Sequence, residues 1–371
     1  MSLLLCCLLT FFLIGCSSTP NHKFDALHTI EGYKNVILMI GDGMGDNHLK
    51  VAEAYNEKPL FITHNAAISG WMKTSSSSSN ITDSAAAATA MSTGFKVNNG
   101  NIANKNGLNL TTMGQFAKAY GKGAGLIATE VLTGATPASF SAHNKSRQNQ
   151  DQIAFEQIRG EVDLFIGAGR EYYDGLTDEM DSHNLSYYTN FDLLEEDIDA
   201  AIAGNSLPFT RFLASYEHIS FAESSPTSPT LKDASLTALR YLENRYDEQG
   251  FFLMIEGSHI DKRAHNKDLM GMINQLNGFD EAVAGVVDWA VQNENTFVLV
   301  TADHETGGLE YHGETKSELN DGMFSTGGHT AQNVPFFIYN SRNLDFIDKD
   351  EIIDNTDVAK LYRAMIRQIA N

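Results

Sequence analysis

Short apolar runs, bounded by Gly, Asp or other polar residues, recur along most of the chain. Within each run the apolar residues are continuous rather than alternating with polar ones, which is typical of strands buried on both faces. The clearest runs are 36–40, 125–128, 164–166, 251–255, 296–300 and 334–339. Helical patterns lie between them, for example at 150–158, 233–245 and 269–291. Strands that alternate with helices predict an α/β fold, a three-layer α/β/α sandwich with a mostly parallel central sheet.

The domain organisation follows from the same alternation. No strong linker interrupts it, so we expect residues 31–371 to form a single domain. Residues 190–231 combine an acidic run with a Ser/Pro-rich stretch, which is typical of a solvated helix face followed by a loop. We expect surface insertions around 171–232 and 309–326.

The N-terminal segment indicates export. Its apolar run 3–14 is shorter than the roughly 20 residues of a membrane-spanning helix and fits the apolar core of a secretory signal. The run ends in Leu-Ile-Gly-Cys, which resembles the lipobox of bacterial lipoproteins. We therefore expect a signal peptide at 1–15, a lipid on Cys16 and a tether at 16–30; an ordinary signal peptide cut elsewhere is the alternative. Ser17 after Cys16 favours a periplasmic protein anchored to the bacterial outer membrane.

Charge and cysteine usage narrow the partners. The chain has 26 Lys and Arg against 47 Asp and Glu, a net charge of −21. This balance argues against binding of nucleic acid as a polymer, because DNA binding requires clustered basic side chains. The three cysteines all lie at or before residue 16, so cleavage there would leave no disulfide and no cysteine metal site.

Candidate chemistry lies where the predicted strands end. Three of the apolar runs lead into carboxylates, at Asp42, at Glu256 and at Asp303, which His304 follows. In open α/β sheets ligands bind at the carboxyl ends of the strands. A carboxylate there is also a common helix cap, but three on one edge make that reading less favourable.

A second pattern places Asp261 and His265 four residues apart, on one face of a helical turn. A carboxylate and an imidazole in this arrangement can bind one cation, although a surface ion pair is the commoner outcome. Asp and His ligands without cysteine suit a zinc ion that keeps an open coordination position.

A third pattern is Asp83-Ser84 directly before four alanines, which favour a helix. One of the two residues is expected to cap that helix. The N-terminus of a helix also offers backbone N–H groups and a positive dipole to an anion, so Ser84 could be a nucleophile for phosphate.

Taken together, these segments resemble the alkaline phosphatase family, in its compact bacterial form. The resemblance covers nearly the whole chain after the signal, and the motifs occur in the family's order. They are GDGMG at 41–45, TDSA at 82–85, ATPA at 135–138, SR at 146–147, EGS-x-IDK-x-x-H at 256–265, TADHETGG at 301–308 and STGGHT at 325–330.

The resemblance implies two Zn²⁺ and one Mg²⁺ per chain. The first Zn²⁺ would be held by Asp261, His265 and His329. The second would be held by Asp42, Asp303, His304 and the Ser84 oxygen. The Mg²⁺ would be held by Asp42 as a bridge, Thr136 and Glu256.

The resemblance also implies a reaction. Phosphate monoesters of broad range would be hydrolysed to alcohol and inorganic phosphate through a phosphoserine at Ser84, with an alkaline optimum. Arg147 would clamp two phosphate oxygens, and Lys262 would reach phosphate through water. A homodimer is implied by family analogy. The alternatives are a phosphodiesterase of the same superfamily and a non-catalytic phosphate-binding lipoprotein.

One position departs from the family pattern. Gly134 precedes Ala135-Thr136-Pro137, where the family usually has Asp or His near the third metal. Because glycine has no side chain to bind a metal-bound water, we expect a weaker or more exchangeable Mg²⁺ site.

Overall fold

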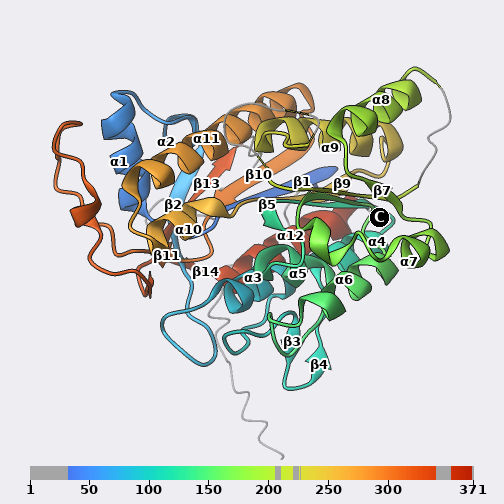
Figure 1. The fold of residues 1–371 in the computed structure, drawn as a ribbon, viewed down its shortest axis with the longest axis horizontal. Helices are drawn as coiled ribbons and strands as arrows, with labels where there is room; N and C mark the ends of the chain where they lie inside the picture. Colours follow the sequence, from blue (N-terminus) through green and yellow to red (C-terminus); the bar gives the residue numbers. More distant parts are fainter. Residues whose placement is uncertain (1–31, 205–209, 220–224, 226, 340–351, 370–371) are drawn as a thin grey trace, which may run out of the picture.

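The computed structural model describes residues 32–204, 210–219, 225, 227–339 and 352–369 (Figure 1). The expected signal peptide at 1–15, Cys16 and most of the tether at 16–30 lie outside these residues. Among the described helices, none is both long and apolar enough to cross a membrane.

A ten-stranded sheet forms the centre of the molecule, in the order β14-β2-β13-β10-β1-β9-β5-β6-β8-β7. Among these strands only β13 runs antiparallel to its neighbours. The mostly parallel sheet confirms the predicted fold class. The strands are β1 (Asn35–Gly41), β2 (Ile68–Lys73), β5 (Gly123–Val131), β6 (Leu164–Ala168), β7 (Ser186–Tyr188), β8 (Phe212–Tyr216), β9 (Phe251–Gly257), β10 (Thr296–Thr301), β13 (Val334–Tyr339) and β14 (Ile352–Asp354).

Helices cover both faces of the sheet, as Figure 1 shows. The layer above it in that view contains α1 (Asp46–Asn56), α2 (Phe61–His64), α8 (Phe191–Ile202), α9 (Leu231–Arg245), α10 (His259–His265) and α11 (Leu269–Gln292). The layer below contains α3 (Ser84–Thr93), α4 (Met113–Ala119), α5 (Ala135–Ser141), α6 (Gln150–Arg159), α7 (Thr177–Ser182) and α12 (Asn355–Ile369).

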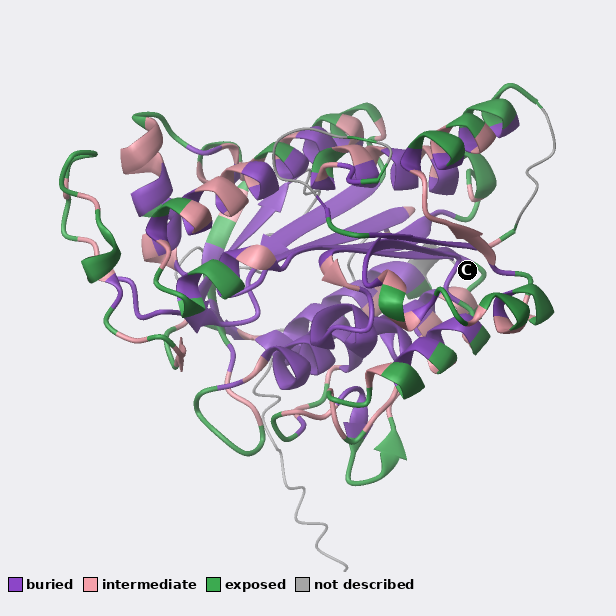
Figure 2. Ribbon diagram, in the orientation of Figure 1, coloured by how far each residue is buried: buried purple, intermediate pink, exposed green. Residues whose placement is uncertain are grey.

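The core lies around the central strands, which are buried along their whole length (Figure 2). Their Val, Ile, Leu and Phe side chains face helices on both sides, and each fully buried one stabilises the fold by about 1.5–3 kcal/mol. Tyr362 of α12 ties the lower layer to the sheet, because its hydroxyl donates a 2.6 Å hydrogen bond to the Ile37 carbonyl. Its ring also meets the edge of Phe252, with 6.0 Å between centroids.

Three neighbouring strands bring the predicted carboxylates to one edge. Strand β1 pairs in parallel with β9 on one side and β10 on the other. Ile40 of β1 is level with Glu256 and with Thr301. Asp42 and Asp303 each follow two residues later, so the sheet presents all three carboxylates at the carboxyl ends of its central strands.

The two stretches expected as insertions differ from one another. Residues 171–232 contain β7 and β8, which extend the central sheet beyond β6. Residues 309–326 leave the sheet as a loop that contains a short 3₁₀ helix, Asp321–Met323. This loop connects two short paired strands, β11 (Glu305–Thr306) and β12 (His329–Thr330). A small hairpin, β3 (Asn104–Lys105) and β4 (Leu108–Asn109), lies below the lower helical layer in Figure 1.

Candidate active site

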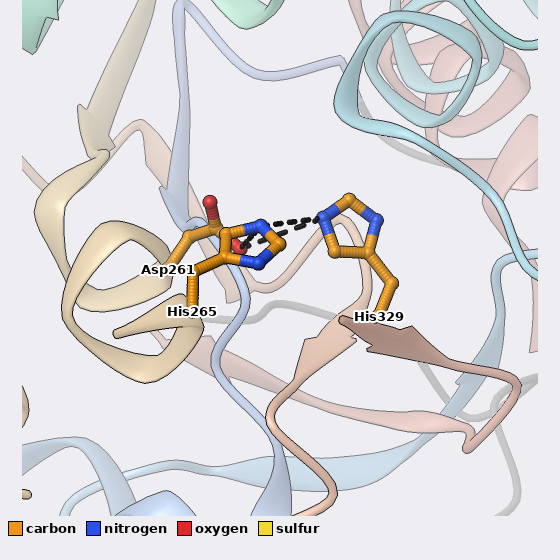
Figure 3. A group of neighbouring side chains, drawn as sticks. All are labelled: Asp261, His265 and His329. Atoms are coloured by element: carbon orange, nitrogen blue, oxygen red, sulfur yellow. Dashed lines mark hydrogen bonds and ion pairs between the residues drawn. The ribbon is translucent and has the colours of Figure 1, made fainter. Parts of the chain in front are cut away.

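The first group of potential metal ligands is Asp261, His265 and His329 (Figure 3). Helix α10 places Asp261 and His265 one turn apart, and β12 brings His329 opposite them. The Nε2 atoms of the two histidines are 3.1 Å apart, and they lie 3.3 and 3.6 Å from Oδ1 of Asp261. The i, i+4 spacing therefore produces the predicted shared face, and a distant strand completes it.

Backbone carbonyls orient both imidazoles. Nδ1 of His265 lies 2.7 Å from the Gly327 oxygen, and Nδ1 of His329 lies 2.9 Å from the Thr82 oxygen. A carbonyl only accepts hydrogen bonds, so each Nδ1 carries the proton and each Nε2 turns its lone pair inward. Two lone pairs and a carboxylate facing one another repel unless a cation or a proton lies between them. In the absence of a metal, a hydrogen bond to Asp261 raises the pKa of His265 to about 9.

The second group is Asp42, Asp303 and His304, all buried. Nε2 of His304 lies 3.2 Å from Oδ2 of Asp303 and 3.6 Å from Oδ1 of Asp42. Burial, then the charges of Asp303 and Asp261, raises the pKa of Asp42 well above its usual range. Burial lowers the pKa of His304, which favours the neutral imidazole that a metal binds.

Thr306 links the two groups. Its hydroxyl donates a short hydrogen bond to Asp261 and lies 3.2 Å from Nδ1 of His304. Since the hydroxyl proton is given to Asp261, its oxygen accepts from Nδ1–H of His304. That fixes the His304 tautomer with the Nε2 lone pair toward Asp42 and Asp303, the outer-shell arrangement typical of metal-binding histidines.

Ser84 lies at the start of α3, beside the second group. Asp83 is the N-cap, and its Oδ1 accepts a 3.0 Å hydrogen bond from the Ala86 N–H. Ser84 is thereby released from capping, and its buried Oγ lies 3.2 Å from Nε2 of His304. The cap and the candidate nucleophile are thus adjacent residues, and the sequence pattern serves both purposes.

Glu256 and Thr136 lie close to Asp42, on β9 and α5. Burial and the neighbouring Glu130 raise the pKa of Glu256 to about 8. The nearby hydroxyls of Ser258 and Thr136 partly offset this rise by lowering the pKa of Glu256. Neither hydroxyl is in hydrogen-bond geometry with the Glu256 carboxylate.

The unpaired buried oxygens test whether metal ions fit. Among the described residues, no hydrogen-bond partner is available to the atoms Asp42 Oδ1, Asp303 Oδ2, Glu256 Oε1 and Oε2, and Thr136 Oγ1. Burying such atoms unpaired is costly, and bound cations would satisfy them. The imidazole and carboxylate groups suit Zn²⁺, and the set of oxygens alone suits Mg²⁺.

Arg147 faces the same region from the loop after α5. Its backbone N–H donates to the Gly100 oxygen at 2.8 Å, and its Nη1 lies 3.2 Å from Oδ2 of Asp83. That oxygen also accepts from the Gly100 N–H at 3.0 Å. This ion pair holds the guanidinium beside Asp83, the residue directly before Ser84.

Lys262 forms an ion pair with Glu130, which the sequence reasoning did not consider. Glu130 lies near the carboxyl end of β5. Its position follows the rule that singled out Asp42, Glu256 and Asp303, a charged residue at the end of a buried strand. The predicted apolar run ends at residue 128, two residues before Glu130, whereas the strand continues to Val131.

The comparison with known proteins decides the family. The family model described as alkaline phosphatase matches residues 33–365. The chain belongs to the alkaline phosphatase family. The matched span contains all the motifs on which the resemblance rested.

Two relatives within the family come from Bacillus subtilis strain 168. Alkaline phosphatase 4 is 35% identical over 295 residues, which is 74% of this chain and 62% of that protein. Alkaline phosphatase 3 is 32% identical over 360 residues, 90% of this chain and 71% of that protein. The chain therefore spans less than two thirds of the first of these relatives.

Solved alkaline phosphatases share the fold. The enzyme from the Antarctic bacterium TAB5 superposes with a TM-score of 0.76 at 27% identity, covering 91% of this chain and 98% of that one. A TAB5 variant with Mg bound in its M3 site gives the same TM-score. The cold-active enzyme from Shewanella sp. gives 0.77 at 25% identity, covering 90% of this chain and 99% of that one.

Proposed function

We propose that this chain hydrolyses phosphate monoesters by attack of Ser84 on phosphorus. One observation carries the proposal. The Ser84 hydroxyl begins a helix and lies 3.2 Å from a buried imidazole that belongs to one of two metal-ligand groups. Asp83 already caps α3, so helix capping does not explain why Ser84 lies beside this imidazole.

Two Zn²⁺ and one Mg²⁺ are the proposed cofactors. Asp261, His265 and His329 would hold one Zn²⁺, and Asp42, Asp303 and His304 the other, with Ser84 Oγ as a further ligand. Asp42, Thr136 and Glu256 would hold Mg²⁺. When bound, the cations would lower the pKa of the serine hydroxyl, polarise the phosphate and stabilise the leaving oxygen.

The chain's own residues would act as follows. Ser84 Oγ gives up its proton to water and forms a bond to phosphorus, while the bond from phosphorus to the alcohol oxygen breaks and that oxygen takes up a proton from water. The resulting phosphoserine is hydrolysed by water, which returns Ser84 and releases inorganic phosphate. The backbone N–H groups at the start of α3 face the anion, and the helix dipole favours its charge.

Arg147 would bind two of the non-bridging phosphate oxygens with its planar guanidinium. Asp83 pairs with that guanidinium at 3.2 Å. The Arg147 side chain therefore has less conformational freedom to lose when phosphate binds. Together, the clamp and the cations engage three non-bridging oxygens, which a monoester has and a diester lacks. This argues against the phosphodiesterase alternative. Lys262 would contribute through water.

The proposed residues all act on the phosphate group and not on the alcohol that carries it. This supports hydrolysis of monoesters of a broad range of alcohols. An alkaline optimum is supported by the ligands, because a metal binds only deprotonated imidazole and carboxylate groups. In the metal-free protein the pKa of His265 is about 9, so zinc displaces a proton from this site at neutral pH. The lipid on Cys16, the outer-membrane location and the homodimer stay predictions.

The test compares hydrolysis of a phosphate monoester and a diester by the zinc- and magnesium-loaded protein. We expect the monoester to be preferred and Ser84→Ala to lose nearly all monoester turnover while keeping its zinc content. Ser182 lies at the end of α7, which contributes no residue to the proposed site. Ser182→Ala is therefore a matched control that should leave turnover unchanged. Preference for the diester, or full monoester turnover in Ser84→Ala, would reject the proposal.

A further inference from the structure

Glu130 is a near-buried carboxylate beside this site to which the family resemblance gives no role. Strand β5 pairs in parallel with β9, and Ala128 is level with Glu256. Glu130 follows two residues later and therefore extends past the same sheet edge. Its side chain is only 12% exposed.

Two contacts define the place of its carboxylate. Oε2 forms an ion pair with the Lys262 ammonium. Oε1 lies in the space that a side chain at residue 134 would need. A Cβ added to Gly134 would lie 2.5 Å from this oxygen. The Glu130 carboxylate thus occupies the position beside α5 that the missing side chain leaves open. The prediction of a weak Mg²⁺ site assumed that residue 134, usually Asp or His, was the source of the hydrogen-bonding side chain there, and Glu130 offers another source.

We propose that Glu130 is a positioning residue of the Mg²⁺ site, where its carboxylate accepts hydrogen bonds from waters on the ion and holds Lys262 beside them. The inference rests on the proposed Mg²⁺ site. Mg²⁺ takes six oxygen ligands and usually keeps several waters, and Asp42, Thr136 and Glu256 supply only part of that set. The charges also balance, because Mg²⁺ and Lys262 together offset the three carboxylates.

Electrostatics support this placement. Glu130 is, after burial, the largest cause that raises the pKa of Glu256, so the two carboxylates share one low-dielectric region. It also acts on Asp42 in the same direction and stabilises the charged form of Lys262. Three carboxylates facing one another repel, and one lysine does not offset all three. A divalent cation in this region relieves that repulsion.

The experiment titrates Mg²⁺ into the zinc-loaded protein by calorimetry, which measures binding without turnover. We expect Glu130→Gln to weaken Mg²⁺ binding by about 10–100-fold, the usual loss when an outer-shell partner is removed. Zinc content should not change. Glu179→Gln is the matched control, because it breaks another glutamate ion pair, with Arg159 at 2.6 Å, and should leave Mg²⁺ affinity unchanged.

Lys262→Met separates a metal role from a merely structural ion pair. It breaks the same ion pair but keeps the carboxylate, so we expect Mg²⁺ affinity to be retained or increased. Equal losses in Glu130→Gln and Lys262→Met would overturn the proposal, and so would wild-type affinity in Glu130→Gln. Glu130-dependent Mg²⁺ binding by a protein without monoester turnover would refute the proposed function and leave this inference standing.

Discussion

Asp83 combines two tasks in one carboxylate. One oxygen caps α3, and the other pairs with Arg147. The sequence indicated the cap, because Asp before an alanine run is a familiar helix start. It could not indicate the contact with Arg147, since the two residues are 64 positions apart and meet only when α3 and the loop after α5 pack together.

Asp83→Asn is predicted to separate these tasks. Asparagine caps helices about as well as aspartate, so the cap should remain and only the hydrogen bond from the Gly100 N–H to the second oxygen is lost with the ion pair. Its amide cannot pair with Arg147, and a partly exposed ion pair is worth up to about 1 kcal/mol. We expect KM for a monoester to rise by up to about fivefold, since 1.4 kcal/mol corresponds to a factor of ten.

Steady-state kinetics and thermal unfolding measure the two effects of Asp83→Asn. Asp83→Ala is the comparison, because it also removes the cap and should unfold more easily by about 1 kcal/mol. An unchanged KM in Asp83→Asn would show that Arg147 does not depend on this carboxylate.

His48 is predicted to make the metal-free fold sensitive to acid. It is fully buried in α1, and burial lowers its pKa from 6.5 to about 4. Between these values the unfolded chain binds a proton that the folded chain excludes. Stability is therefore complete above pH 6.5 and falls as the pH drops from 6.5 to 4, by about 3 kcal/mol at most.

Urea unfolding with EDTA at pH 7 and at pH 4.5 measures this dependence. The His48→Gln variant keeps an acceptor for the Gly45 N–H, which donates to Nδ1 of His48 at 3.2 Å. We expect its stability to change less between the two pH values than that of the wild type. An equal change in both proteins would refute the assignment to His48.

At the scale of elements, the continuous apolar runs located the central strands well. The run at 36–40 became β1 and the run at 296–300 became β10, each with one or two residues added at the ends. Strand β2 was missed because its exposed and buried residues alternate around a glycine. Strands β7 and β8 were hidden in an expected insertion, because both are short and contain serine among their apolar residues.

The candidate site could be predicted only in part from residue patterns. The spacing of Asp261 and His265 and the carboxylates at the strand ends pointed to cations. The third member of the first group, His329, came from the family resemblance, because nothing local connects it with α10. Glu130 was missed altogether.

Gly257→Ala is predicted to disturb the packing of β9 against α11. A Cβ at this position would lie 2.7 Å from Cδ2 of Phe279, so either the strand or the helix must move. Overpacking of this kind typically costs about 1–3 kcal/mol. We expect a lower unfolding temperature and weaker Mg²⁺ binding, because Glu256 precedes this glycine.

Gly285→Ala in α11 is the matched control for Gly257→Ala. Its Cβ would meet the flexible Lys232 side chain at 3.2 Å, and alanine favours a helix interior by about 1 kcal/mol over glycine. This variant should be as stable as the wild type or more stable. A Gly257→Ala protein that unfolds no more easily than Gly285→Ala would contradict the packing argument.

At the scale of the whole molecule, an acidic protein surrounds a site proposed to bind an anion. The net charge of −21 repels phosphate esters at long range, whereas Arg147 and bound cations would attract them at contact. Salt screens the long-range repulsion with a Debye length of about 10 Å at 0.1 M. We expect kcat/KM for a monoester to rise as ionic strength increases from low to physiological values.

Sodium chloride and an osmotically matched sucrose series distinguish screening from a general solvent effect. Only the salt series should raise kcat/KM. A fall in kcat/KM with increasing salt would mean that the field near the site is already attractive.

The central claim is that Ser84 becomes covalently phosphorylated during turnover. The most direct measurement is a rapid acid quench of the metal-loaded protein with a phosphate monoester, followed by mass spectrometry of its peptides. The account predicts a phosphoryl group on Ser84 in the wild type and none in Ser84→Ala, which should also lack turnover. Monoester turnover without phosphorylation of Ser84, or sustained turnover by Ser84→Ala, would contradict it.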